Sequence, residues 1–197
     1  MTIWFTSDPH YLHKNIMEYC PGRKQLGDTV EAMVEGLIKR YCEKVKPGDS
    51  VYFLGDVMFG RHKESPDNMQ KVFCRLPGQK FLIRGNHDHY TKEEWFSKHF
   101  VWIRDYYELG ISEGKEKKRV ILCHYPMLVW NGAHHENFML HGHSHGGVDV
   151  PNRETLRLDV GVDAEHSNYY PLSYEQIKEI MSKKAYKPFD HHGTRDL

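Results

Sequence analysis

The sequence predicts a layered α/β domain in which two β-sheets pack together and helices lie outside them. Two features indicate this fold class. The first half alternates short apolar runs with longer runs of helical spacing, and the second half is richer in strand-like segments. No Pro/Gly/Ser-rich linker and no internal repeat divides the 197 residues. We therefore expect one domain over residues 1–197, with a core at about 1–185 and a polar C-terminal tail at 186–197.

The elements of the first half follow from its apolar runs and from the residues that flank them. Buried strands are expected at residues 3–5, 51–54 and 80–83. Helices are expected after three N-terminal signals: Asp28 capping a helix through Val45, Ser65 before Pro66 for a helix through about Arg75, and Thr91 with Glu94 as a capping box. Strand and helix therefore alternate through this half.

The second half is expected to hold a hairpin, two further strands and a final helix. Residues 105–111 and 118–123 flank the turn-forming triplet Ser112-Glu113-Gly114, which predicts the hairpin. The apolar run at 138–140 and the segment 157–162 predict the other strands. Ser173 with Gln176 forms a second capping box, so a helix should run from there to about Lys184.

Composition excludes several classes of protein. Lys plus Arg and Asp plus Glu both number 27, so the basic excess that a long nucleic acid requires is absent. No stretch of 18 apolar residues and no secretory signal pattern occurs, so we expect neither a membrane span nor export. The four cysteines lie far apart, without a C-x-x-C pair, which fits a reducing interior and argues against a cysteine-rich zinc site. A cytoplasmic protein is expected.

The informative pattern is the position of the polar clusters. Five strand-like runs each end in side chains that can bind a metal: Asp8 and His10, Asp56, Asn86 with His87 and Asp88, His124, and His143 with His145. Ligands gather at the carboxyl ends of strands in α/β sheets, because the loops there converge over a rigid platform. Each cluster alone is weak evidence, whereas five in this order predict a metal centre.

The ligand types indicate which ions bind. Carboxylate, imidazole and amide donors without a thiolate suit divalent ions such as manganese, which we expect first, or iron, zinc, nickel or magnesium. Several histidines and two aspartates exceed the needs of one ion. Two ions that share a carboxylate are therefore expected, an arrangement that stabilises in-line displacement at phosphorus.

The motifs D-x-H, G-D, G-N-H-D, H and G-H-x-H, in this order over about residues 3–175, resemble those of the calcineurin-like metallophosphoesterases. The opening at residues 7–16, S-D-P-H-Y-L-H-K-N-I, looks like that of small bacterial and phage members. The resemblance implies a four-layer α/β/β/α sandwich of two mixed sheets. It also implies that Asp8, His10 and His145 bind one ion, that Asn86, His124 and His143 bind the other, and that Asp56 bridges them.

The resemblance further implies the catalytic roles. His87 would donate a proton to the leaving oxygen, and Asp88 would orient His87 by accepting its other N–H. The nucleophile would be a metal-bridging hydroxide. His13 and Arg84 are candidate substrate contacts, but a loop histidine and a sheet-edge salt bridge are the alternative interpretations. For Arg84, the salt bridge is the favoured interpretation.

The sequence leaves three functions open. A phosphodiesterase acting on small or nucleotide-type diesters is favoured, because a chain of this length has no room for a cap over the cleft. A phosphomonoesterase is the alternative, and a non-catalytic metal-binding scaffold is less favoured because His87 is present. The expected partner is a small phosphoester, with no long nucleic acid and no membrane, and the protein is expected to be a monomer or a homo-oligomer.

Overall fold

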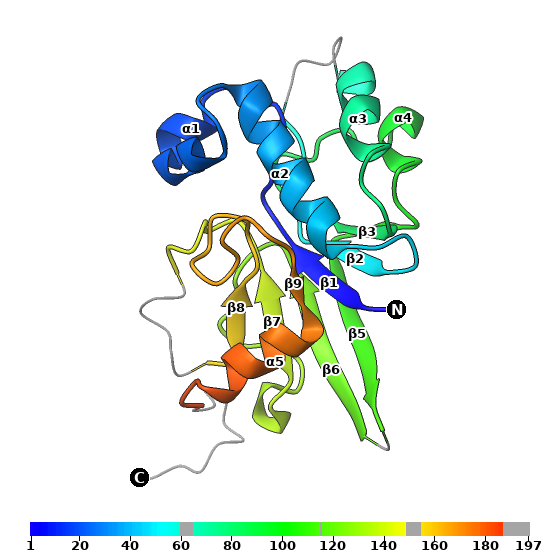
Figure 1. Ribbon diagram of the computed structural model, residues 1–197. Helices are drawn as coiled ribbons and strands as arrows, with labels where there is room; N and C mark the ends of the chain where they lie inside the picture. Colours follow the sequence, from blue (N-terminus) through cyan, green and yellow to red (C-terminus); the bar gives the residue numbers. More distant parts are fainter. Residues whose placement is uncertain (60–64, 115, 149–154, 187–197) are drawn as a thin grey trace.

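The five-stranded sheet carries the first three predicted strands side by side. The computed structural model describes residues 1–59, 65–114, 116–148 and 155–186, so residues 187–197 of the predicted tail lie outside the described residues. The strand order is β4-β3-β2-β1-β9, and Figure 1 labels β1, β2, β3 and β9 of this sheet. Four strands are parallel and β9 pairs antiparallel with β1. Their bounds are β1 Ile3–Thr6, β2 Ser50–Phe53, β3 Gln79–Ile83, β4 Ile103–Arg104 and β9 Leu172–Ser173.

The four-stranded sheet has the order β5-β6-β7-β8 and is also mixed. Its bounds are β5 Tyr106–Glu113, β6 Glu116–Cys123, β7 Phe138–His141 and β8 Arg157–Asp159. The predicted hairpin is β5–β6, but Ser112 and Glu113 of the predicted turn belong to β5, and β6 begins at Glu116. Both sheets and their flanking helices confirm the predicted layered sandwich of two mixed sheets.

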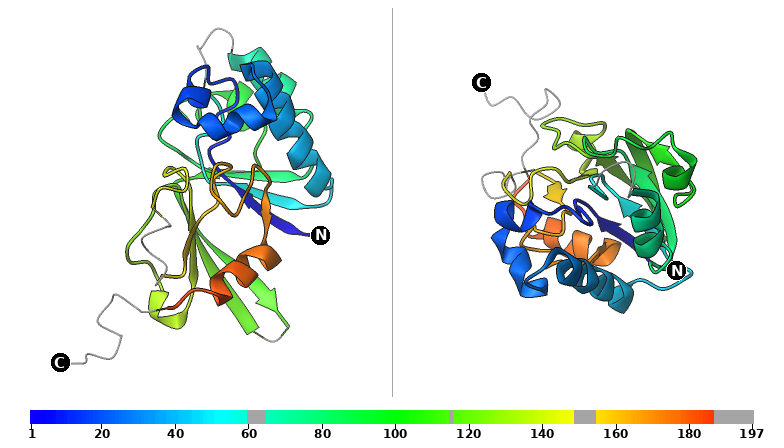
Figure 2. Two further views of the ribbon diagram at one scale, coloured as in Figure 1. Left: turned by 60° about the vertical axis from the view of Figure 1, so that its left-hand side comes forward. Right: turned by 90° about the horizontal axis from the view of Figure 1, so that it is seen from above.

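Helices cover the outer face of the five-stranded sheet, as the turned view in Figure 2 shows. These elements are α1 Ile16–Tyr19, the 3-10 helix η1 Pro21–Leu26, α2 Val30–Lys44, α3 Ser65–Phe73 and α4 Glu94–Ser97. The 3-10 helix η2 Ala133–His135 and α5 Tyr174–Ser182 pack against the other apolar cluster. Within the described ranges, no helix is long and apolar enough to cross a bilayer.

Two apolar clusters explain why the central strands of the five-stranded sheet are continuous hydrophobic runs in the sequence. Val51 and Phe53 of β2 face the cluster formed with α2, α3 and α4, whereas Tyr52 and Leu54 face the cluster shared with the other sheet. Because successive side chains of a strand point to opposite faces, a strand covered on both faces needs apolar residues at every position. Ile177 of α5 is buried in the cluster that includes residues of both sheets.

Some of the predicted N-terminal helix caps are present in the structure, and others are not. The capping box at Ser173 is present, with its Oγ accepting from Gln176 N and the Gln176 side chain accepting from Ser173 N. The cap of α2 is Thr29 and not Asp28, since the Thr29 Oγ1 accepts from Ala32 N at 3.1 Å. The predicted capping box at Thr91 is wrong: α4 is a single turn preceded by Glu93, with no side-chain cap. Neighbouring cap-type residues cannot be told apart by sequence pattern alone.

Candidate metal centre

The carboxyl ends of β1, β2 and β3 meet those of β6 and β7, so both sheets contribute to one site. The loops after these strands carry the seven side chains predicted to bind metal, which are Asp8, His10, Asp56, Asn86, His124, His143 and His145. The structure brings them into two neighbouring groups, Asp8 with His10 and His145, and Asp56 with His124 and His143. Asn86 joins the second group through its Oδ1, 2.9 Å from His124 Nε2.

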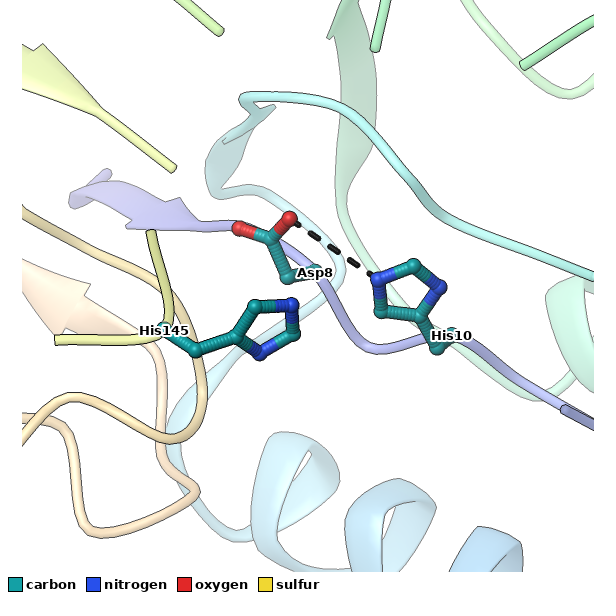
Figure 3. Close-up of side chains that lie close together, drawn as sticks. All are labelled: Asp8, His10 and His145. Atoms are coloured by element: carbon teal, nitrogen blue, oxygen red, sulfur yellow. Dashed lines mark ion pairs between the residues drawn. The ribbon is translucent and has the colours of Figure 1, made fainter. Parts of the chain in front are cut away.

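The first group lies between the β1 loop and the β7 loop. Figure 3 shows the side chains of Asp8, His10 and His145 pointing toward one another, with His10 Nε2 4.0 Å from Asp8 Oδ1. Asp8 is fully buried, and its Oδ1 has no hydrogen-bond partner within the described part of the chain. Burial raises the pKa of Asp8 to about 8, since an ionised carboxyl without a counter-ion is costly there. A cation between these side chains would supply that counter-ion.

His10 has the charge state that a metal ligand needs. Burial, followed by the charge of Arg23, lowers the pKa of His10 to about 2, so the ring stays neutral. A neutral imidazole offers a lone pair to a metal, whereas a protonated one does not. The donor set of this group therefore fits a divalent cation.

The second group is arranged around Asp56. Its Oδ2 lies 3.7 Å from His10 Nε2 of the first group and 3.6 Å from His124 Nε2. His124 Nδ1 lies 2.7 Å from the Leu54 carbonyl oxygen, to which it donates, so its Nε2 presents a lone pair toward Asp56 and Asn86. Burial lowers the pKa of His124, which again keeps a buried ring neutral. One carboxylate oxygen thus lies between ligands of both groups.

The loops that carry these side chains adopt unusual backbone conformations. Asp8, His10, Asp56, His143 and His145 all have φ between 46° and 68°. Non-glycine residues rarely occupy this left-handed region, and such residues cluster at functional sites where the surrounding contacts hold them. The loops are therefore fixed by the tertiary structure.

Two glycines leave room for the aspartates. A Cβ on Gly85 would lie 2.9 Å from Asp56 Cγ, and one on Gly142 would lie 2.7 Å from Ser7 Cβ and closer still to Asp8 Oδ2. Real Cβ atoms do not approach so closely. The glycines of the G-N-H-D and G-H-x-H motifs are thus required by space, at positions without a positive φ.

His87 faces the site, but Asp88 does not form the predicted hydrogen bond to His87. His87 Nε2 lies 4.0 Å from Asp56 Oδ2, and its side chain is 38% exposed, so it borders both the metal residues and solvent. The buried Asp88 carboxylate instead accepts backbone N–H groups from Gly85, Asp56 and Val57, at 2.8, 2.9 and 3.0 Å. The predicted hydrogen bond to His87 is absent from the described residues, because a tight turn directs Asp88 under the strand ends. Asp88 joins the β2 and β3 loops.

The two candidate substrate residues lie beside the centre. The His13 ring packs on Phe59 at 4.1 Å and lies 5.6 Å from the His10 ring. Arg84 Nη2 pairs with Asp105 Oδ1 at 2.6 Å, as the sheet-edge interpretation predicted. Arg84 also lines, with Asn86, a pocket of about 420 Å³. Neither position identifies His13 or Arg84 as a substrate contact.

Sequence reasoning missed three charged residues that hold the loops. Arg23 of η1 is fully buried and contacts Asp163, which in turn lies 2.7 Å from His145 Nδ1. Burial favours neutral His145, but hydrogen bonds to Asp163 and Cys20 and the charge of Asp8 raise its pKa to about 10, so without a metal the ring carries a proton that a bound cation would displace. Asp159 accepts from Ser144 Oγ and from the backbone N–H groups of Gly146 and Gly161.

One of these residues carried a usable signal. Asp163 directly follows the predicted strand segment 157–162, as the predicted ligands follow their own strands. Arg23 lies in a short polar segment without periodicity, so no local pattern distinguishes it.

Comparisons with known proteins point to one family. The family model of calcineurin-like phosphoesterases matches residues 1–178. An uncharacterized protein of Methanocaldococcus jannaschii is 28% identical over 183 residues, which cover 92% of each chain. The Gene 66 protein of Mycobacterium phage D29 is 28% identical over 200 residues, 91% of this chain and 96% of that one. A crystal structure of an Aquifex aeolicus protein of unknown function has a TM-score of 0.66 at 22% identity, covers 91% of this chain and 98% of that one, and indicates a shared fold.

Proposed function

The chain belongs to the calcineurin-like phosphoesterase family, and on this premise we propose that it is a phosphodiesterase that uses two divalent ions to hydrolyse a small or nucleotide-type diester. Membership of the family supports a metal-dependent hydrolase. The number of ions, the diester preference and the residue roles are our proposal.

One observation carries the proposal. Asp56 Oδ2 lies 3.7 Å from His10 Nε2 and 3.6 Å from His124 Nε2, so a single oxygen is shared between two ligand groups. Paired ions roughly 3.5–4 Å apart commonly share a carboxylate in this way. Asp8, His10 and His145 would hold one ion, Asn86, His124 and His143 the other, and Asp56 would contact both.

The ions would supply positive charge to the phosphoryl group and activate water. The chain's own contribution is to fix the ligands and to move a proton. We assign the proton transfer to His87, whose Nε2 lies 4.0 Å from Asp56 Oδ2 and whose side chain is open to solvent on its other side. A substrate between His87 and the ions would have its leaving oxygen within reach of that nitrogen. We assign Asp88 the role of holding the backbone of Asp56, and not that of orienting His87.

Two features support a diester over a monoester. His143 is exposed and His87 is partly exposed, so the described residues leave the centre open to a substrate with a substituent on each side. Arg84, the candidate cation for the second charge of a monoester, is already paired with Asp105. A diester carries a single negative charge at phosphorus, which the ions can offset without further cations.

The test is a paired measurement on metal-loaded protein. Elemental analysis should find two ions per chain. Rates on bis-p-nitrophenyl phosphate should exceed those on p-nitrophenyl phosphate. His87→Ala should lower kcat by about 10²–10⁴-fold while metal content stays unchanged. His166→Ala, an exposed histidine on the loop after β8, is the matched control and should leave the rate unchanged.

Each outcome favours one alternative. A strong preference for the monoester would replace the diesterase by a phosphomonoesterase. Two bound ions with no hydrolysis across a panel of mono-, di- and cyclic phosphoesters would indicate a metal-binding scaffold.

We propose manganese as the native ion, with iron, zinc, nickel and magnesium as alternatives, because the donors are carboxylate, imidazole and amide groups. Reconstitution with each ion in turn would rank them. We also propose a cytoplasmic location, which the four free thiols support.

A further inference from the structure

Arg23 connects the two loops of the Asp8–His10–His145 group. We propose that Arg23 and Asp163 are positioning residues for this group alone, and that without them the chain loses one of its two ions selectively. This inference rests on the proposed two-ion site. It concerns residues outside the seven proposed ligands and outside every motif quoted from the sequence.

The first step is the contact of Arg23 with the β1 loop. Its Nη2 donates to the Asp8 carbonyl at 2.7 Å, and its Nη1 donates to the Pro9 carbonyl at 2.8 Å. Asp8 and His10 on this loop have φ of 54° and 46°, so the strand conformation ends there. Buried carbonyl groups without a partner are costly, and the guanidinium satisfies two of them. Arg23 therefore stabilises the backbone conformation that directs Asp8 and His10 into the site.

The second step is the contact with Asp163 on the loop after β8, through which Arg23 holds the β7 loop. Arg23 Nε and Nη2 form a fork on Asp163 Oδ1 and Oδ2, at 2.8 and 2.5 Å. Asp163 Oδ2 also accepts from His145 Nδ1 at 2.7 Å. A hydrogen bond at Nδ1 fixes the tautomer and the orientation of the ring, and leaves Nε2 free to bind a metal. His145 is thus held by Asp163, and Asp163 by Arg23.

The other group has supports that do not involve Arg23 or Asp163, and it meets the first group where His10 N donates to the Asp56 carbonyl at 3.1 Å and His143 N donates to Asp8 Oδ2 at 2.9 Å. His124 is held by the Leu54 carbonyl, and the backbone of Asp56 by Asp88. None of the described hydrogen bonds of Arg23 or Asp163 reaches these residues. Disturbing the Arg23–Asp163 pair should therefore affect the ion of Asp8, His10 and His145 first.

The geometry requires an arginine. One guanidinium satisfies four acceptor positions in a plane, on Asp163, Asp8 and Pro9. A lysine keeps the charge but presents a single nitrogen, so it cannot form the fork and reach both carbonyls at once. Arg23→Lys therefore removes the positioning hydrogen bonds while it keeps the positive charge.

The test measures metal binding directly. Metal-free wild type, Asp163→Asn and Arg23→Lys are titrated with Mn²⁺ by calorimetry, and metal content is measured after gel filtration. Wild type should bind two ions. Asp163→Asn keeps the shape of the side chain, and it should bind one ion as wild type does and the other about 10–100-fold more weakly. Electron paramagnetic resonance should then report isolated Mn²⁺ in place of a coupled pair.

Arg75→Lys is the matched control. Arg75 forms the same kind of fork, with Glu35 at 2.5 and 2.6 Å, but on exposed side chains. This variant should bind both ions normally. Melting of the metal-free proteins separates a general loss of stability from the loss of one ion, and Asp163→Asn decides the question if Arg23→Lys does not fold.

The outcomes are distinguishable. Two ions bound to Asp163→Asn with wild-type affinities, or an equal weakening of both, would overturn the positioning role. Wild type that binds fewer than two ions would instead overturn the proposed function, and this inference with it.

Discussion

Replacing Gly85 by alanine should damage the metal centre through one methyl group. Gly85 has no positive φ, so alanine adds no backbone strain there. Its Cβ, however, would lie 2.9 Å from Asp56 Cγ and closer to other Asp56 atoms. Ordinary carbon–carbon contacts lie at about 3.5–4.0 Å, so the Asp56 carboxylate would have to retreat by at least about 0.6 Å.

Asp56 cannot retreat without loss. Its Oδ1 accepts from His87 N at 2.8 Å, and its own N donates to Asp88 Oδ2 at 2.9 Å. Metal–ligand distances vary by only about 0.2 Å, so a retreat of this size removes a shared ligand from both proposed ions. We expect affinity for Mn²⁺ to fall by at least about tenfold, and overpacking to lower stability by about 1–3 kcal/mol.

Gly48→Ala is the matched control, because a Cβ at this exposed turn meets nothing within 4 Å. It should leave metal binding unchanged and should not lower stability. Calorimetric titration with Mn²⁺ measures the first effect, and urea unfolding of metal-free protein measures the second. If Gly85→Ala binds both ions as tightly as Gly48→Ala does, the steric argument for the glycine of G-N-H-D is wrong.

Three further substitutions test other parts of the structure. Asp88→Asn leaves a buried backbone N–H of the β2–β3 junction without its acceptor and should lower stability by about 1–3 kcal/mol in urea unfolding; unchanged stability would contradict the role given to Asp88. Ser173→Ala removes the cap of α5 and should lower stability by about 1 kcal/mol in thermal unfolding, with metal binding unaltered. Arg75→Met removes the hydrogen bond that holds the pKa of Glu35 below its ordinary value. Because that pKa is lower in the folded state than in the unfolded state, the pair stabilises the fold above the ordinary value and loses this contribution as the pH falls through the folded value. The small stability difference between wild type and variant at neutral pH should therefore vanish in acid, and a difference that persists there would refute this origin.

The strand ends could be found from local sequence. Apolar runs at 51–54 and 80–83 predict β2 and β3 closely, since both faces of these strands are buried. Asp56 and Asn86 come two and three residues after these runs. Position after a strand is a local property, and parallel neighbours place such residues at one edge.

Local pattern was less reliable for the helices and for short edge strands. Thr91 and Glu94 have the spacing of a capping box, yet α4 starts after Glu93. Strand β9 has two residues and owes its pairing to β1, so no periodicity could reveal it. Here tertiary contacts outweigh propensity.

The sequence by itself determined the identity and order of the seven proposed ligands, because each belongs to a short motif at the end of a strand. Only the tertiary structure decided what holds them. Arg23 and Asp163 are 140 residues apart, and Asp88 turned out to bind backbone N–H groups. Such contacts join loops from different elements, and their partners are fixed by packing, which leaves no spacing for the sequence to display.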